Sequence, residues 1–188
     1  MIPTIRMGEE PNYLERFSTW LRDLAQEAES LASLIDDGAV PEGTRLSLIS
    51  AINYIFKSLD LIPEGIDDVG YLDDAFVLRV AAEQGSEQDL LDLDPDKLQV
   101  LNRLAGDADV VRDFLGKDFA RLNEYVKGLR KGSARGRSGA DILRDATMRA
   151  AFLQDLKNFC RAYAAPRFAQ EEKSLVKLRA FFDAKLPK

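Results

Sequence analysis

The stretch that decides the fold is residues 59–76, which reads Leu-Asp-Leu-Ile-Pro-Glu-Gly-Ile-Asp-Asp-Val-Gly-Tyr-Leu-Asp-Asp-Ala-Phe. It contains six carboxylates, one proline and two glycines, follows one strongly apolar segment and leads into another. Pro63 cannot continue a helix, and Gly65 and Gly70 can adopt the backbone conformations that a tight reversal needs. We therefore assign these three residues a structural role, and we expect the chain to turn back on itself here.

The apolar segments on either side, residues 44–58 and 74–84, have hydrophobic side chains around most of a helical circumference. Helices of this kind lie at the centre of a bundle. Thr44 is the expected cap of the first helix, and Asp73 or Asp74 of the second, because short polar side chains accept hydrogen bonds from the amides of a first turn. The sequence thus predicts an antiparallel helical hairpin over about 44–84, with an acidic loop at its tip.

The remaining sequence also has mostly helical periodicity, and no stretch alternates convincingly with period two. We predict an all-α, single-domain helical bundle, with residues 1–130 forming the bundle that contains the hairpin. Residues 131–139 are expected to be a basic flexible loop, and residues 140–188 a C-terminal helical pair packed on the same core. The other helices are expected at 12–38, 95–105, 108–115, 117–130, 140–164 and 168–184.

Composition narrows the classes of function. The chain has no histidine, which excludes Ser-His-Asp and Cys-His nucleophile systems and His-ligated zinc. Its single cysteine, Cys160, lies among apolar helix positions, and the absence of disulfides fits a reducing, cytoplasmic setting. The longest uncharged apolar run, residues 46–56, is too short for a transmembrane helix, and we expect no signal peptide.

Charge is distributed unevenly along the chain. Residues 1–94 carry 20 acidic and 6 basic side chains, a net of −14, whereas residues 95–188 carry 12 acidic and 20 basic ones, a net of +8. Such a division favours either two oppositely charged faces or two halves that attract each other on folding.

Two blocks of the hairpin carry a resemblance to a known family. Asp60-Leu61-Ile62-Pro63 is followed by Gly70-Tyr71-Leu72-Asp73-Asp74, which leads into Ala75-Phe76-Val77-Leu78. Over about 47–82 this pattern and its spacing resemble the YkvA-like family of bacterial domains of unknown function. The resemblance implies a small helical hairpin module, often membrane-associated elsewhere, and carries no activity. Peripheral membrane contact therefore stays open for this chain, although its charged flanks argue against it.

The acidic loop is a candidate site for a divalent metal. Hard cations such as Ca²⁺ and Mg²⁺ prefer several oxygen ligands, and a tight turn can bring carboxylates together. The alternative is that Asp60 and Asp73 bind backbone amides while the central acids face water. No other cofactor is predicted. The candidate metal ligands are Asp60, Glu64, Asp67, Asp68, Asp73 and Asp74.

The basic loop is a candidate anion-binding site, because flexible arginines can follow phosphates. The candidate residues are Lys131, Arg135 and Arg137, with Lys127, Arg130 and Arg144 nearby. The loop lacks interleaved aromatic residues and the chain is acidic overall, which argues against nucleic acid. The alternative is a loop that is solvated or paired with the acidic half of the chain.

These observations favour a non-enzymatic, cytoplasmic interaction or regulatory module. It would associate with itself or with an unknown protein partner, through its charge asymmetry or an apolar groove beside the hairpin. The chain has no Walker loop, dinucleotide fingerprint or nucleophile elbow. The alternative function is a divalent-metal-binding protein or a metal-dependent phosphoester hydrolase that uses the acidic loop, residues 60–74.

Overall fold

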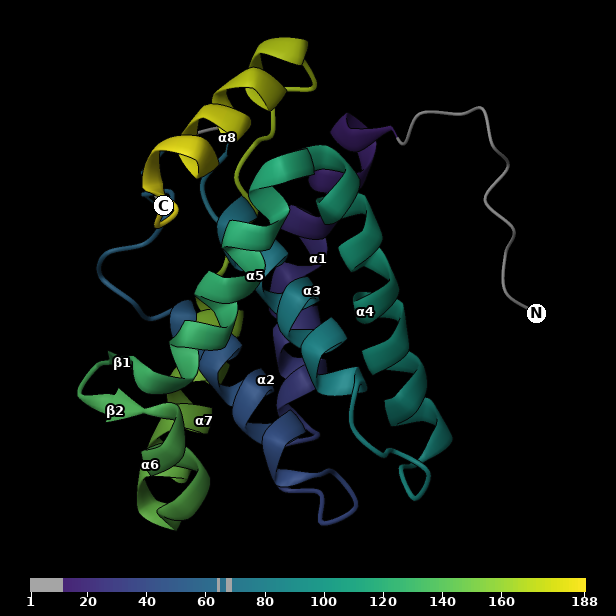
Figure 1. The fold of residues 1–188 in the computed structure, drawn as a ribbon. Coiled ribbons are helices and arrows are strands. Elements are labelled where there is room, and N and C mark those ends of the chain that lie inside the picture. The colour runs from purple at the N-terminus through teal and green to yellow at the C-terminus, as the bar shows by residue number, and fades with distance from the viewer. Residues whose placement is uncertain (1–11, 64, 67–68) are drawn as a thin grey trace.

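A computed structural model describes residues 12–63, 65–66 and 69–188, and it confirms the predicted all-α class (Figure 1). In the described part no helix combines the length and the apolar character needed to cross a bilayer. The elements are α1 Tyr13–Ala32, α2 Glu42–Tyr54, α3 Leu72–Ser86, α4 Pro95–Leu115, η1 Gly116–Asp118, α5 Phe119–Gly128, η2 Leu129–Lys131, β1 Ser133–Ala134, β2 Arg137–Ser138, α6 Gly139–Arg144, α7 Ala146–Ala162 and α8 Glu172–Lys185.

Helix α3 is the centre of the molecule, and it packs against α1, α2, α4 and α5 (Figure 1). Nearly all of its residues are buried, as its apolar circumference predicts. The hydrophobic core extends to both ends of the chain, because Phe17 of α1 and Phe182 of α8 each pack against Phe76 of α3.

Hydrogen bonds fix the direction of α2 relative to α3. Thr44 Oγ1 donates to the carbonyl oxygen of Gly85 at 2.8 Å, and the Tyr54 hydroxyl donates to Asp73 at 2.6 Å. The start of α2 thus lies beside the end of α3, and the end of α2 beside its start. Thr44 is therefore not the helix cap that the sequence suggested: α2 begins at Glu42, after Pro41, and the threonine hydroxyl is used in a contact between helices.

Helix boundaries differ from the expected ones where local signals are weak. Asn12 caps α1, and the helix ends at Ala32 rather than near residue 38. Gly106 does not divide α4, which continues through it. The long helix expected at 140–164 is interrupted at Asp145, whose carboxylate accepts hydrogen bonds from two amides at the start of α7.

Residues 133–138 form a short antiparallel β-hairpin where a flexible loop was expected. Its turn consists of Arg135 and Gly136, both with positive φ (50° and 73°), the conformation that two-residue hairpin turns require. Two residues per strand are too few for an alternating pattern to be visible in the sequence.

Gly139 permits a close approach between α6 and α2. A Cβ atom at this position would lie 2.5 Å from Ser50 Oγ and 3.1 Å from a Leu46 methyl group. A larger residue would require these side chains to move, so the glycine favours the close approach that holds the start of α6 against α2.

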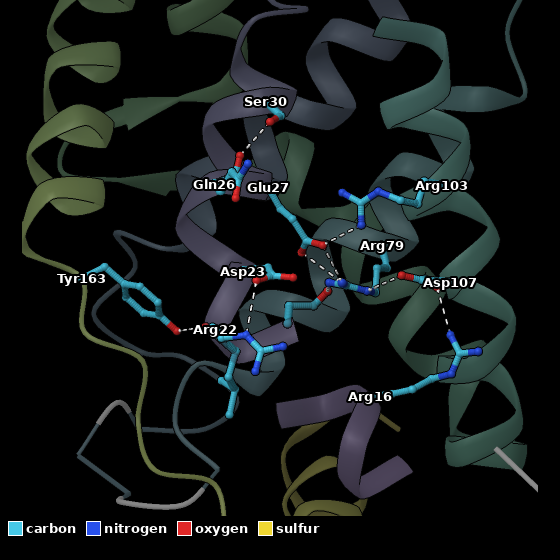
Figure 2. A network of polar contacts seen from close by, with 12 residues as sticks. Arg16, Arg22, Asp23, Gln26, Glu27, Ser30, Arg79, Arg103, Asp107 and Tyr163 are labelled. Atoms are coloured by element: carbon cyan, nitrogen blue, oxygen red, sulfur yellow. Dashed lines mark hydrogen bonds and ion pairs between the residues drawn. The ribbon is translucent and has the colours of Figure 1, made fainter. Parts of the chain in front are cut away.

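A buried arginine ties three helices together (Figure 2). Arg79 of α3 has no exposed side-chain surface, donates to both carboxylate oxygens of Glu27 at 3.0 Å and lies 3.4 Å from Asp107 of α4. Its guanidinium also stacks on Trp20, 3.8 Å from the ring centroid. Burial lowers the pKa of Arg79, and the nearby Glu27 and Asp107 oppose that shift. The ion pairs thus keep a buried charge at the centre of the bundle.

Arg79→Met should destabilise the protein strongly, by about 3–5 kcal/mol, because Glu27 loses its buried partner. Arg103 provides the matched control: it contacts the same carboxylate at 3.1 Å, but its side chain is 54% exposed. We expect Arg103→Met to cost about 1 kcal/mol or less, as solvent-exposed ion pairs do. Urea unfolding of the two variants measures the difference, and equal midpoints would contradict this account.

Candidate functional site

A cluster of hydrogen bonds closes the tip of the α2–α3 pair, and we call it the tip clasp. It consists of Tyr54, Leu61, Ile62 and Asp73. The Tyr54 hydroxyl donates to Asp73 Oδ2 and accepts from the Leu61 amide at 2.8 Å. The same Asp73 oxygen accepts from the Ile62 amide at 3.1 Å. The Asp73 carboxylate and the Tyr54 hydroxyl thus bind backbone amides of the loop that follows α2.

The electrostatics of the tip clasp follow from its burial. Asp73 has no exposed surface, and burial raises the pKa of its carboxyl to about 6, against the opposing effect of the bonds from Tyr54 and the Ile62 amide. Burial and the nearby Asp73 and Asp74 raise the pKa of Tyr54 well above its usual range. The phenol therefore keeps its proton as a hydrogen-bond donor. Asp73 cannot reach a substrate in solvent, so its observed role is to hold the loop.

The candidate metal ligands are only partly described by the structure. Asp73 and Asp74 are buried in the first turn of α3, and Asp60 is half-buried. Glu64, Asp67 and Asp68 lie outside the described residues. Within residues 12–63, 65–66 and 69–188 no group of three or more acidic or cysteine side chains could hold a metal ion. Metal binding by the whole loop stays a prediction.

In the described part of this loop the positive φ occurs at Tyr71, at 66°, a residue for which no such conformation was predicted. The Gly70 amide donates to the Ile66 carbonyl oxygen at 2.9 Å, and the Ile66 amide donates to that of Pro63 at 3.0 Å, so a series of tight turns leads into α3. Asp73 does not serve as the N-cap, because α3 begins after Tyr71 and the Asp73 carboxylate bonds across the loop to Ile62.

Two of the candidate anion-binding residues form ion pairs within the protein. Arg135 and Arg137 both form ion pairs with Asp155 of α7, at 3.3 and 2.5 Å, and Arg137 is largely buried. Arg135 also lies over the Phe56 ring. Lys131 is exposed at the end of η2. The two arginines therefore fix the β-hairpin on α7, and anion binding at this place stays a prediction.

A groove lies where α5, the segment after α2 and the C-terminal residues meet. Its volume is about 610 Å³, within the range of small-molecule sites, and its surface is mostly apolar. Two glycines lie on one wall, Gly128 and Gly132, and a Cβ atom at Gly128 would meet no heavy atom within 4 Å. The lining residues are Lys57, Ala120, Arg121, Glu124, Tyr125, Gly128, Leu129, Gly132, Pro187 and Lys188.

Lys57 connects this groove to the tip clasp. Its ammonium donates to the Tyr125 hydroxyl at 3.0 Å and lies 5.2 Å from the Tyr125 ring centroid and 5.8 Å from that of Tyr54. The Tyr54 and Tyr125 rings meet edge to face, with centroids 6.2 Å apart. Because the tip clasp holds Tyr54, it also sets the position of the lysine and of the second tyrosine.

Arg121 of α5 fixes the opposite wall. Its guanidinium donates to the main-chain oxygens of Asp183 at 3.1 Å and Pro187 at 3.0 Å, and also to that of Leu186. The same side chain pairs with Asp118 at 2.9 Å. These bonds hold the end of α8 and the residues after it against α5, so that Pro187 can line the groove.

Sequence reasoning did not identify this site. Lys57 lies just after α2, and its partner Tyr125 follows 68 residues later. No local spacing brings these two residues together. The available signal was a lysine close to a strongly apolar segment, which indicates a polar contact without naming its partner.

Asp73→Asn should alter the dependence of stability on pH. A carboxyl group whose pKa is raised from 3.8 to about 6 binds its proton more tightly in the folded state. Its contribution to the free energy of unfolding is therefore greatest below pH 4 and falls by about 3 kcal/mol as pH rises to about 6. Asparagine keeps the acceptor oxygen and does not titrate. Urea unfolding from pH 4 to 7 should show this fall in the wild type and not in the variant.

Asp141→Asn is a control in which the dependence of stability on pH has the opposite sign. Hydrogen bonds from Ser138 lower the pKa of Asp141. Its contribution to the free energy of unfolding is therefore present above the normal pKa of an aspartate and is lost as pH falls. Parallel stability curves for the wild type and Asp73→Asn would show that Asp73 does not titrate in this range.

Comparison with known proteins identifies only the hairpin. Residues 44–79 match the model of a family described as a protein of unknown function (DUF1232). No curated protein and no solved structure matches the chain. The matched segment comprises most of α2, the tip clasp and α3 as far as Arg79. The YkvA-like resemblance is thus confirmed over this segment, which carries the signature of the DUF1232 family.

Proposed function

We propose that this protein is a non-enzymatic binding module that takes an apolar ligand into the groove beside α5. The observation that carries the proposal is the groove itself, about 610 Å³ of mostly apolar surface. Burial of apolar ligand surface in such a site is favourable by about 25 cal/mol per Å². The groove adjoins the segment that matches the DUF1232 family, so the binding function includes the family hairpin.

The polar groups around the groove support binding rather than chemistry. Arg121 is engaged by Asp118 and by main-chain oxygens, and Glu124 is paired with Lys127 at 3.0 Å. General acid–base catalysis needs a titratable group within hydrogen-bond reach of the substrate. The carboxyl group with the raised pKa, Asp73, is fully buried in the tip clasp. The charged residues of this region thus have structural partners that fix the groove walls.

Gly128→Phe should block the groove. A Cβ atom at Gly128 meets no heavy atom within 4 Å, and the residue lies on the wall, so the added ring will occupy ligand space. We expect the affinity for N-phenyl-1-naphthylamine, a neutral aromatic probe, to fall at least about tenfold, or about 1.4 kcal/mol. Fluorescence titration measures the affinity.

Gly106→Phe is the matched control. Gly106 is exposed on α4 and does not line the groove, and a Cβ atom there also meets nothing within 4 Å. Both substitutions replace a helical glycine, so neither should unfold the protein. Probe affinity should be unchanged in this variant. Absence of saturable binding by the wild type, or equal affinity in the Gly128→Phe variant, would refute the proposal.

A further inference from the structure

Lys57 places a positive charge in the groove. Within residues 12–63, 65–66 and 69–188 no carboxylate forms an ion pair with it, whereas Arg121 and Glu124 beside it are both paired. Its ammonium has three donors, and the one protein acceptor described for them is the Tyr125 hydroxyl. The side chain is half-buried, so its charge is only partly compensated by water.

Tyr125 supplies a second donor at the same place. Its hydroxyl oxygen accepts from Lys57 at 3.0 Å, which leaves the hydroxyl proton directed elsewhere. Among the described residues no acceptor is recorded for that proton. An ammonium and a phenol O–H side by side can donate to the two oxygens of one oxyanion, and hydrogen bonds to a charged acceptor are the stronger kind.

The rest of the groove suits an apolar chain. Leu129 and Pro187 provide hydrocarbon surface, and Gly128 and Gly132 let a ligand lie against the backbone. A ligand that matches both parts has one anionic end and an aliphatic body. We propose that the groove binds a free aliphatic carboxylate, with its carboxylate at Lys57 and Tyr125 and its chain along Leu129 and the glycines. This inference rests on the proposed function and specifies its ligand class.

The charge of the site favours a monoanionic carboxylate over a membrane surface. Lys57 supplies an ammonium beside the Tyr125 hydroxyl, which matches one carboxylate, and the nearby Glu124 would oppose a dense anionic surface. The groove is concave and of small-molecule size, which suits a ligand that enters whole.

The test is displacement of the bound neutral probe by dodecanoate and by 1-dodecanol, which differ only in the head group. The wild type should bind dodecanoate at least about tenfold more tightly than the alcohol. Lys57→Met keeps the aliphatic stem and removes the charge, so the preference should fall to near unity while probe and alcohol binding persist. Tyr125→Phe should reduce the preference by a smaller factor.

Lys157→Met makes the same change of net charge at an exposed position on α7, outside the groove, and should leave the preference unchanged. Equal displacement by the two ligands in the wild type, or a preference that survives in Lys57→Met, overturns the inference while the proposed function stands. Binding to phosphatidylglycerol vesicles without displacement by dodecanoate also overturns it. Failure of the wild type to bind the probe would instead refute the proposed function.

Discussion

The constraint on which the structure depends is the burial of the Asp73 carboxylate. A carboxylate that is removed from water must find hydrogen-bond donors, and here they come from the end of α2 and from the loop that follows it. Because both donors bind one oxygen, the loop cannot leave the helix without exposing the carboxyl group and the amides that depend on it. The tip clasp therefore determines how α2 and α3 meet, and α3 in turn is the surface on which the other central helices pack.

The same cluster sets the geometry of the groove. Tyr54 contributes its hydroxyl to the tip clasp and its ring to the contact with Lys57 and Tyr125. A residue of the family segment thus positions a side chain of α5, which lies outside that segment. Of the residues that line the groove, Lys57 lies within the segment matched by the family model, and the others come from α5, from residues 129–132 and from the C-terminal residues.

The fold class was predictable from the sequence because periodic apolar residues identify helices regardless of their partners. Several of the details that failed depend on contacts between distant residues. The Thr44 hydroxyl has the chemistry of a cap, but Gly85 offers an acceptor 41 residues away. Gly106 weakens a helix locally, yet α4 continues through it because its flanking turns pack on the core. Arg79 appeared as an interruption in an apolar helix, since nothing in its own segment reveals Glu27 or Asp107.

The candidate site was less predictable than the fold. The acidic loop was conspicuous in the sequence, whereas the observed role of its residue Asp73 is to hold the loop. The groove joins residues from three separate parts of the chain, and most of them are small or apolar, so no spacing distinguishes them from core positions. Of the basic residues, Arg135 and Arg137 meet on the single carboxylate of Asp155, a contact that their own segment does not reveal.

The close contact at Gly139 couples the β-hairpin region to the helix that precedes the tip clasp. A Cβ atom at this position would lie 2.5 Å from Ser50 Oγ and 3.1 Å from a Leu46 methyl group. A larger residue here would require both side chains to move, or the start of α6 to shift away from α2. The spacing between these two helices therefore depends on the absence of one side chain.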